Sequence, residues 1–312
     1  MSAGDQPESV RPDLAELLSR RELAGDEGRP EAVAARHRKG GRTARENIDD
    51  LIDPGSMVEY GRHAVAAQRA RRSADELRER TPADGLVSGT ARINGELFGE
   101  RAACAVLSYD YTVLAGTQGM TGHRKKDRLF ELIRRMKLPT VFFAEGGGGR
   151  PGDTDHAVVS GLDVPAFALW AALSGEVPRI AVVAGNCFAG NAVIAGCADL
   201  IVATENSSIG MGGPAMIEGG GLGVFQPVEI GPIEVQRENG VVDIVVADEA
   251  EAVQVAKQYL SYFQGRTTDW AAPDQEALRD IVPIDRLRPY DIRLVIDGLF
   301  DVGSVLELRR DF

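Results

Sequence analysis

Small residues follow a buried apolar run in the stretch Arg179-Ile-Ala-Val-Val-Ala-Gly-Asn-Cys-Phe-Ala-Gly-Asn-Ala192. The β-branched run indicates a buried strand, and the Ala-rich segment after it indicates a helix. Such a turn gathers the free backbone N–H groups of a helix N-terminus in one small space. These donors suit a negative charge that develops on oxygen, for example the oxyanion of an enolate. One strand–turn–helix unit is weak evidence, because many α/β folds contain one.

The same pattern occurs three times along the chain. In the first copy an apolar strand at 138–144 leads into the glycine-rich segment 145–150. The second copy is the stretch 179–192 described above. In the third, an apolar strand at 200–203 leads into the small-residue segment 207–214. Strands that alternate with helices predict a mainly parallel sheet. Loops at the carboxyl ends of parallel strands lie on one side, so these glycine-lined loops are expected to converge on one site. None matches the GxGxxG or GxxxxGK[ST] motif, and a dinucleotide or Walker phosphate site is therefore not indicated.

Length and composition narrow the possible classes of protein. The 312 residues are within the range of one large α/β unit, and 44% hydrophobic residues can bury a sizeable core. A net charge of −12 argues against nonspecific nucleic-acid binding. The three cysteines have no CxxC spacing and the histidines have no metal-ligand spacing, which disfavours a metal site. So few cysteines, in an odd number, suit a reducing cytoplasm. No signal peptide and no apolar run long enough to cross a membrane are apparent.

Local patterns also predict the order of the elements. We expect a disordered tail at 1–11, an N-terminal helical extension at 12–80 and a catalytic domain at 81–312. Thr43 and Glu46 have the spacing of a capping box, which predicts a helix start. The further expected elements are two or three helices within 12–53, a basic helix at 63–79, strands at 86–94 and 97–108, helices at 122–136 and 155–174, a loop at 218–231, and helices at 248–263 and 289–299.

Six segments in order carry a resemblance to a known family. They include Glu145-Gly-Gly-Gly-Gly-Arg150, Gly185-Asn-Cys-Phe-Ala-Gly190 and Ile209-Gly-Met-Gly-Gly-Pro214, together with 43–56, 85–95 and 111–119. Over roughly residues 12–312 the chain resembles the N-terminal half of the carboxyltransferase component of biotin-dependent acyl-CoA carboxylases. The resemblance implies an α/β protein with a crotonase-like ββα superhelix and an N-terminal helical extension.

The resemblance also implies a reaction and its catalytic residues. A carboxyl group would move from carboxybiotin to the α-carbon of a short acyl-CoA through an enolate held by backbone N–H groups. The family's oxyanion-binding pair corresponds to Ala189 and Gly190, where many relatives have Gly-Gly and Ala189 narrows the available backbone angles. Gly147 and Gly148 correspond to the pair that lets the backbone approach the thioester. The alternative interpretations are a tight strand–helix junction for the first pair and a flexible loop for the second.

Several other residues are candidates for binding coenzyme A. His123, Arg124 and Lys126 lie near a predicted helix start, where basic residues oppose the helix dipole, so a second reason for them is expected. They could pair with the phosphates of coenzyme A, and a solvated basic face is an equal alternative. Arg150 could bind a phosphate or hold its own loop. The predicted substrate-binding set is completed by Gly146, Gly212 and Gly213.

Cofactors and partners follow from the same resemblance. Biotin would be carried by a partner protein and the coenzyme A thioester would be the substrate, with no metal expected. The expected partners are a complementary C-terminal carboxyltransferase half, a biotin carboxylase and the biotinylated carrier, in a homo- or hetero-oligomer without nucleic acid or membrane. Alone, the chain is expected to be inactive. Its relatives continue into a second crotonase-like domain, so it is either one half of a split enzyme or a fragment.

Three alternatives remain open at this point. A decarboxylase subunit of the same fold would run the transfer in reverse, although the N-terminal helical extension favours the carboxylase. A crotonase-type enoyl-CoA hydratase or isomerase would need a positioned carboxylate, for which Glu145 and Glu205 are candidates. A non-catalytic scaffold subunit would bind no acyl-CoA.

Overall fold

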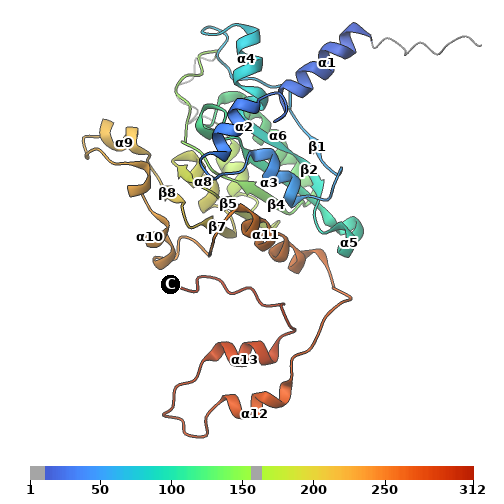
Figure 1. The fold of residues 1–312 in the computed structure, drawn as a ribbon, viewed down its shortest axis with the longest axis vertical. Helices are drawn as coiled ribbons and strands as arrows, with labels where there is room; N and C mark the ends of the chain where they lie inside the picture. The colour runs from blue at the N-terminus through green and yellow to red at the C-terminus, as the bar shows by residue number, and fades with distance from the viewer. Residues whose placement is uncertain (1–10, 156–163) are drawn as a thin grey trace, which may run out of the picture.

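The computed structural model describes residues 11–155 and 164–312, in which a central sheet carries helices on both faces (Figure 1). From β3 onward neighbouring strands are parallel, while the first two pairings are antiparallel. The predicted α/β class with a mainly parallel sheet is confirmed. In spatial order the strands are β1 (Val58–Glu59), β2 (Leu86–Arg92), β3 (Ala103–Tyr109), β4 (Thr140–Phe143), β5 (Arg179–Val183), β7 (Leu200–Thr204) and β9 (Ile244–Val246).

Side chains that alternate along each strand make both faces of the sheet apolar. On β3, Leu107 and Tyr109 enter one hydrophobic cluster, whereas Cys104 and Val106 enter the other. Two groups of helices bury these clusters. The first face is covered by α6 (Met120–Met136), α7 (Ala166–Ala171) and α8 (Gly190–Gly196), and the second by α3 (Ala44–Leu51) and α11 (Glu249–Gln264).

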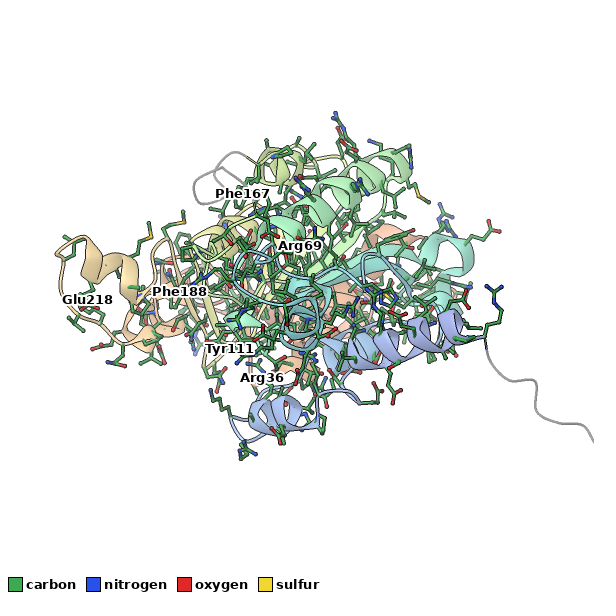
Figure 2. All side chains as sticks on the ribbon, turned by 90° about the horizontal axis from the view of Figure 1, so that it is seen from above. Arg36, Arg69, Tyr111, Phe167, Phe188 and Glu218 are labelled. Atoms are coloured by element: carbon green, nitrogen blue, oxygen red, sulfur yellow. The ribbon has the colours of Figure 1, made fainter. Side chains whose placement is uncertain are left out.

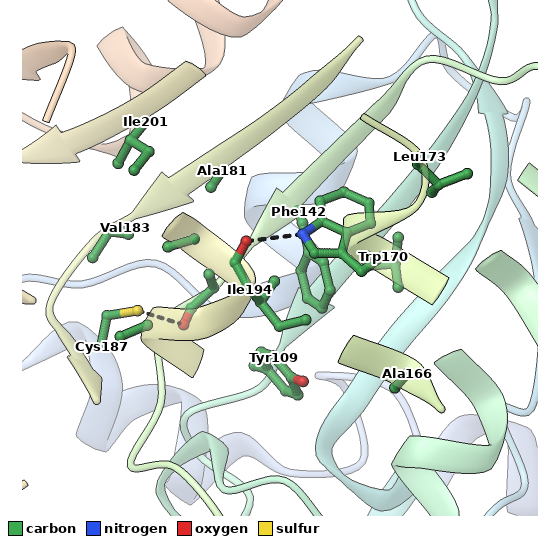
Figure 3. Packing of buried hydrophobic residues seen from close by; sticks show 14 of the residues in the cluster. Tyr109, Phe142, Ala166, Trp170, Leu173, Ala181, Val183, Cys187, Ile194 and Ile201 are labelled. Atoms are coloured by element: carbon green, nitrogen blue, oxygen red, sulfur yellow. Dashed lines mark hydrogen bonds between the residues drawn. The ribbon is translucent and has the colours of Figure 1, made fainter. Parts of the chain in front are cut away.

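Trp170 joins α7 to α8 within the first cluster (Figure 3). Its ring is fully buried and lies 5.1 Å from the ring of Phe130 and 5.9 Å from that of Phe142. Its indole Nε1 donates a hydrogen bond of 2.9 Å to the carbonyl oxygen of Ile194. A buried indole N–H needs such an acceptor, so this bond fixes α8 against the sheet. The bond lies near the C-terminal end of α8, and it fixes the whole helix, including the N-terminus where the predicted oxyanion site lies.

A repeated ββα unit explains how the glycine-lined loops meet. After β5 the chain forms the short strand β6 (Asn186–Phe188) and then α8, and after β7 it forms β8 (Ser208–Gly210) before α9 (Pro214–Gly219) and α10 (Ile233–Glu238). Strands β6 and β8 pair in parallel, and Gly146 forms a parallel bridge to Cys187. Three loops from distant parts of the sequence therefore lie side by side, as predicted.

The N-terminal segment has the predicted helices, α1 (Pro12–Leu23), α2 (Pro30–His37) and α3. Both hydrogen bonds of the predicted capping box of α3 are present, from Glu46 to Thr43 and back. The helix predicted at 63–79 is wrong over residues 63–73. In this segment the helix α4 (Ala74–Arg80) begins only after Ser73, which forms a second capping box at its start.

Two further boundaries differ from the prediction. The strand expected at 97–108 begins only at Ala103, because α5 (Gly95–Phe98) and a 3₁₀ turn (Gly99–Ala102) precede it. Asn94 and Gly99 start these turns with φ values of 63° and 56°, a conformation that ends a strand. Of the helix expected at 155–174, only Ala166–Ala171 is α-helical in the described part, and 156–163 lie outside the described residues. The tail predicted at 1–11 likewise lies outside them, apart from Arg11.

The last third of the chain has its predicted helices. The two helices expected at 248–263 and 289–299 are present as α11 and α13 (Ile292–Leu299), with the short α12 (Leu278–Ile281) between them. The segment predicted as a loop from 218 contains the end of α9 and a 3₁₀ turn at Pro227–Glu229. In Figure 1, α12 and α13 lie away from the sheet. No described helix combines the length and the apolar character that a membrane crossing requires.

Candidate active site

A groove of about 590 Å³ opens where the three loops meet. The loop after β4 contributes Gly147 and Gly149, β6 and the residue after it contribute Asn186, Phe188 and Ala189, and the loop after β8 contributes Gly213. Among the described residues its aromatic side chains are Tyr111 and Phe188, both labelled in Figure 2. The remaining wall is mostly apolar, from Pro151, Pro214, Ala215, Met216 and Pro227. The structure thus brings Gly147, Ala189 and Gly213 of the predicted site together.

The predicted donor of Ala189 already has an acceptor inside the protein, as does the N–H of Gly147. The N–H of Ala189 donates to the carbonyl oxygen of Gly210 at 3.0 Å. The N–H of Gly147 donates to the carbonyl oxygen of Ala115, also at 3.0 Å. An N–H with a good internal acceptor has little left for an oxyanion. The Ala189 N–H, which was predicted to be a catalytic donor, therefore holds the loops in place, and so does the N–H of Gly147. Gly147, which was expected to let the backbone approach the thioester, lines the groove.

Gly148 has the same structural role. Its N–H donates to Oδ1 of Asn191 at 3.0 Å, and its own carbonyl oxygen accepts from the N–H of Gln118 at 2.7 Å. Gly148 is buried and has a φ of 90°, a backbone conformation that favours glycine. A Cβ at this position would lie 2.8 Å from the Cβ of Ala189. Gly148 is thus needed for close packing of the loop against the start of α8.

Gly190 keeps its donor. It is the first residue of α8, whose first N–H groups have no acceptor within the helix. Across residues 11–155 and 164–312, its N–H has no acceptor in the protein. The N–H of Gly149 also lacks one over the same ranges, and Gly149 lines the groove. The candidate donors therefore narrow to Gly190, which was predicted, and Gly149, which was missed because all four glycines of the run look alike.

Ala189 has a strained backbone. Its φ of 50° and ψ of −118° belong to a region that glycine occupies and L-residues rarely do. Such a conformation costs on the order of 1–3 kcal/mol, and it persists only where the surroundings impose it. The imposing contacts are the bond from its N–H to Gly210 and the bond that its carbonyl oxygen accepts from Val193 at 2.9 Å. The sharp turn between β6 and α8 depends on this residue.

The basic cluster at the start of α6 is largely inside the protein. Lys126 is 0% exposed and His123 is 3% exposed. Burial lowers the pKa of Lys126 to about 7, and burial together with Lys126 lowers the pKa of His123 to about 3. The prediction that these two side chains face the phosphates of coenzyme A is corrected, because neither reaches solvent. Arg124, on the outer face of the helix, is exposed.

Arg150 holds its own loop. Its guanidinium is buried, forms an ion pair with Asp84, and donates to the carbonyl oxygen of Thr117 at 2.8 Å. Asp84 in turn accepts from the N–H of Gly122 in α6 at 2.6 Å. Of the two roles predicted for Arg150, the structure shows the loop-holding one.

The remaining predicted glycines differ in position. Gly146 is buried, and its N–H donates to the carbonyl oxygen of Asn186 at 2.7 Å. Gly213 lines the groove, and Gly212 lies beside it without lining it. Gly146 is therefore part of the stacked loops, and Gly213 belongs to the groove wall.

The carboxylates considered for hydratase chemistry lie elsewhere. Glu145 accepts two hydrogen bonds from the guanidinium of Arg36, at 2.9 and 2.6 Å. Burial raises the pKa of Glu145 to about 7, although Arg36 opposes this shift. Glu205 lines a different cavity, beside β9. Among the described residues no Asp or Glu lines the groove, which disfavours the hydratase or isomerase alternative.

Comparison with known proteins gives consistent matches. Residues 35–312 match the carboxyl transferase domain family. The methylmalonyl-CoA carboxyltransferase 12S subunit of Propionibacterium freudenreichii is 31% identical over 96% of this chain and 57% of its own length. The biotin-dependent long chain acyl-coenzyme A carboxylase beta4 subunit of Mycobacterium tuberculosis is 32% identical over 95% of this chain and 56% of its own length. The chain spans little more than half the length of these relatives.

Two solved structures are similar along almost the whole chain. A single-chain, multi-domain long-chain acyl-CoA carboxylase has a TM-score of 0.93 and 62% identity, over 97% of this chain and 30% of that one. The hexameric transcarboxylase 12S structure has a TM-score of 0.78 and 28% identity, over 100% of this chain and 61% of that one.

Proposed function

Since this chain belongs to the carboxyl transferase domain family, we propose that it is the acyl-CoA-binding half of a biotin-dependent carboxyltransferase. The observation that carries the proposal is the Gly190 N–H, which has no acceptor in the described protein and starts α8 beside the groove. The remaining half would come from a segment that this chain does not contain, as its coverage of 57% and 56% of two relatives suggests.

The residues of this chain would bind and polarise the thioester. When the α-proton of an acyl-CoA leaves, the electron pair of the C–H bond moves onto the thioester oxygen, and the Gly190 N–H would stabilise that oxyanion. Carboxylated biotin on a carrier would supply the carboxyl group that bonds to the α-carbon as its N–C bond breaks, and the ureido nitrogen left behind would take up the α-proton. Phe188 and Met216, with the prolines of the wall, give the groove an apolar lining. An acyl-CoA that displaces water from this lining would strengthen the hydrogen bond.

We propose a long apolar acyl group rather than the short one expected from the sequence. The groove wall is mostly apolar, which suits an aliphatic chain. The 62% identical structure is named as a long-chain acyl-CoA carboxylase, whereas relatives named for propionyl- or methylmalonyl-CoA are 26–31% identical. Arg124 remains our proposed contact for a phosphate of coenzyme A. The proposed partners are the complementary half, a biotin carboxylase and a biotinylated carrier, in an oligomer located in the cytoplasm.

Carboxyl transfer in the intact assembly tests this function. A tagged chain is purified from its own cells with the subunits that accompany it, and receives carrier biotin carboxylated with ¹⁴C-bicarbonate. We expect label on palmitoyl-CoA more than on propionyl-CoA. No label on any acyl-CoA would refute the carboxyltransferase. Turnover of an enoyl-CoA without biotin would instead support a hydratase, and failure to bind any acyl-CoA would support a scaffold.

A further inference from the structure

Behind the groove lies a line of three buried polar side chains that the reaction above does not use. We propose that Lys126, Gln118 and Asn191 form a positioning chain that sets the glycine loop against the start of α8. All three are positioning residues, because none of them lines the groove. The inference rests on the proposed function for its catalytic consequence, and on contacts within the protein for its geometry.

The chain of hydrogen bonds has a direction that Lys126 imposes. An ammonium group can only donate, and Nζ donates to Oε1 of Gln118 at 2.6 Å and to the hydroxyl of Tyr109 at 2.7 Å. The oxygen of the Gln118 amide must therefore face Lys126, which turns its Nε2 toward Asn191. This Nε2 donates to Oδ1 of Asn191 at 3.2 Å. The protonated Lys126 thus orients the Gln118 amide, which in turn donates to Asn191.

The orientation of Asn191 decides what it offers to the glycine loop. With Oδ1 facing inward, it accepts the N–H of Gly148 at 3.0 Å. Its Nδ2 faces the carbonyl oxygens of Ala144, Glu145 and Gly116, at 3.2, 3.4 and 3.4 Å. A reversed amide would place its NH₂ group against the Gly148 N–H and its single oxygen against three carbonyl oxygens. Asn191 holds the loop only in the orientation that Gln118 imposes.

Gln118 also contacts both sides of the junction directly. Its backbone N–H donates to Gly148, and its carbonyl oxygen accepts from the N–H of Arg150 at 3.0 Å. On the other side, a Cβ built on Gly190 would lie 2.9 Å from Nε2 of Gln118. The residue that carries the proposed oxyanion donor therefore packs against the side chain that Lys126 orients.

The cost of burying Lys126 supports a role beyond stability. Among the described residues its only hydrogen-bond acceptors are the neutral groups of Tyr109 and Gln118. An ammonium without a carboxylate partner loses its hydration, and the depressed pKa of about 7 reflects that loss. An apolar side chain of the same length would avoid it. The neighbouring Lys125, which donates to the backbone carbonyls of Ala83 and Leu86, provides a matched control.

The test compares Lys126→Met with Lys125→Met in the intact assembly. We expect Lys126→Met to keep its fold, with a melting temperature at pH 7 no lower than that of the wild type, while kcat falls about 10- to 100-fold, the scale of a displacement of about 1 Å at a reacting centre. The KM for palmitoyl-CoA should change less than about threefold, because the oxyanion forms only in the transition state. Lys125→Met should keep the kcat of the wild type. A folded Lys126→Met with unchanged kcat would overturn the proposal.

A second variant and a second measurement test the positioning chain even if Lys126→Met fails to fold or the assembly is inactive. Gln118→Glu keeps an acceptor for Lys126 but cannot donate to Asn191, so it should lower kcat in the same way even if Lys126→Met does not fold. Amide hydrogen exchange of residues 145–150 needs no activity. Faster exchange in Lys126→Met or Gln118→Glu than in Lys125→Met supports the positioning chain, and equal exchange overturns it. An inactive wild type with this exchange pattern would refute only the proposed function.

Discussion

An exchange of a single backbone atom would separate catalysis from folding at the start of α8. Replacing Gly190 by glycolic acid changes its amide N–H into an ester oxygen and adds no side chain. Because this N–H has no acceptor in the described protein, its loss removes no internal hydrogen bond, and the free energy of unfolding should change by less than about 0.5 kcal/mol. Loss of one oxyanion donor typically lowers kcat by about 10²–10³-fold, or roughly 3–4 kcal/mol in the barrier.

The neighbouring residue gives the matched control. An ester at Ala189, introduced as lactic acid, removes the N–H that donates to Gly210 at 3.0 Å. This change should destabilise the fold by about 1 kcal/mol, the net value of one such bond, with a smaller effect on kcat. Both proteins are assayed for carboxyl transfer to palmitoyl-CoA and for unfolding in urea. A Gly190 ester that is as active as the wild type would refute the assignment of this donor.

Three further outcomes follow from the geometry. Ala189→Gly should raise the free energy of unfolding by up to about 2 kcal/mol in urea. The relief of about 1–3 kcal/mol of backbone strain exceeds the cost of the conformational entropy that glycine adds to the unfolded chain. A lower free energy of unfolding would show that the backbone of Ala189 is not strained. The pKa of Lys126 is about 7 in the fold against 10.5 in a free side chain, so the unfolded state binds more protons between these values. The melting temperature of the wild type should therefore rise relative to that of Lys126→Met between pH 7 and 10. A difference in melting temperature that does not change with pH would contradict the depressed pKa. Asp84→Ala leaves the Arg150 guanidinium buried without its main partner and should cost about 3–5 kcal/mol in thermal unfolding; a cost under about 1 kcal/mol would show that the pair is not essential.

Much of the fold is predictable because its signals are local. The β-branched runs that form β5 and β7 are too short and too apolar for surface helices, and the alternation of strands and helices predicts their parallel pairing. The capping box at Thr43 and Glu46 places the start of α3 correctly, since both bonds join residues three apart. The convergence of the glycine loops follows from the same topology, because parallel strands end on one side.

The details of the site were not predictable, because they depend on contacts between residues far apart in the sequence. Whether the N–H of Ala189 is free depends on the carbonyl of Gly210, which arrives from the next ββα unit. Lys126 stands in a basic, surface-like stretch, and only the packing of α6 against β3 shows that it is buried. Asn191 looked like any polar residue at a helix start, yet it accepts from a glycine 43 positions away.

The thioester carbonyl itself provides the most direct test of the proposed site. An acyl-CoA labelled with ¹³C at the thioester carbon allows its C=O stretch to be isolated in the infrared difference spectrum of the bound complex. Saturation is confirmed by calorimetry. If the Gly190 N–H holds the carbonyl oxygen, binding should shift the stretch to lower frequency than in water, and the Gly190 ester should lose most of that shift. A bound thioester whose stretch matches that of free acyl-CoA in both proteins would contradict the proposed oxyanion site.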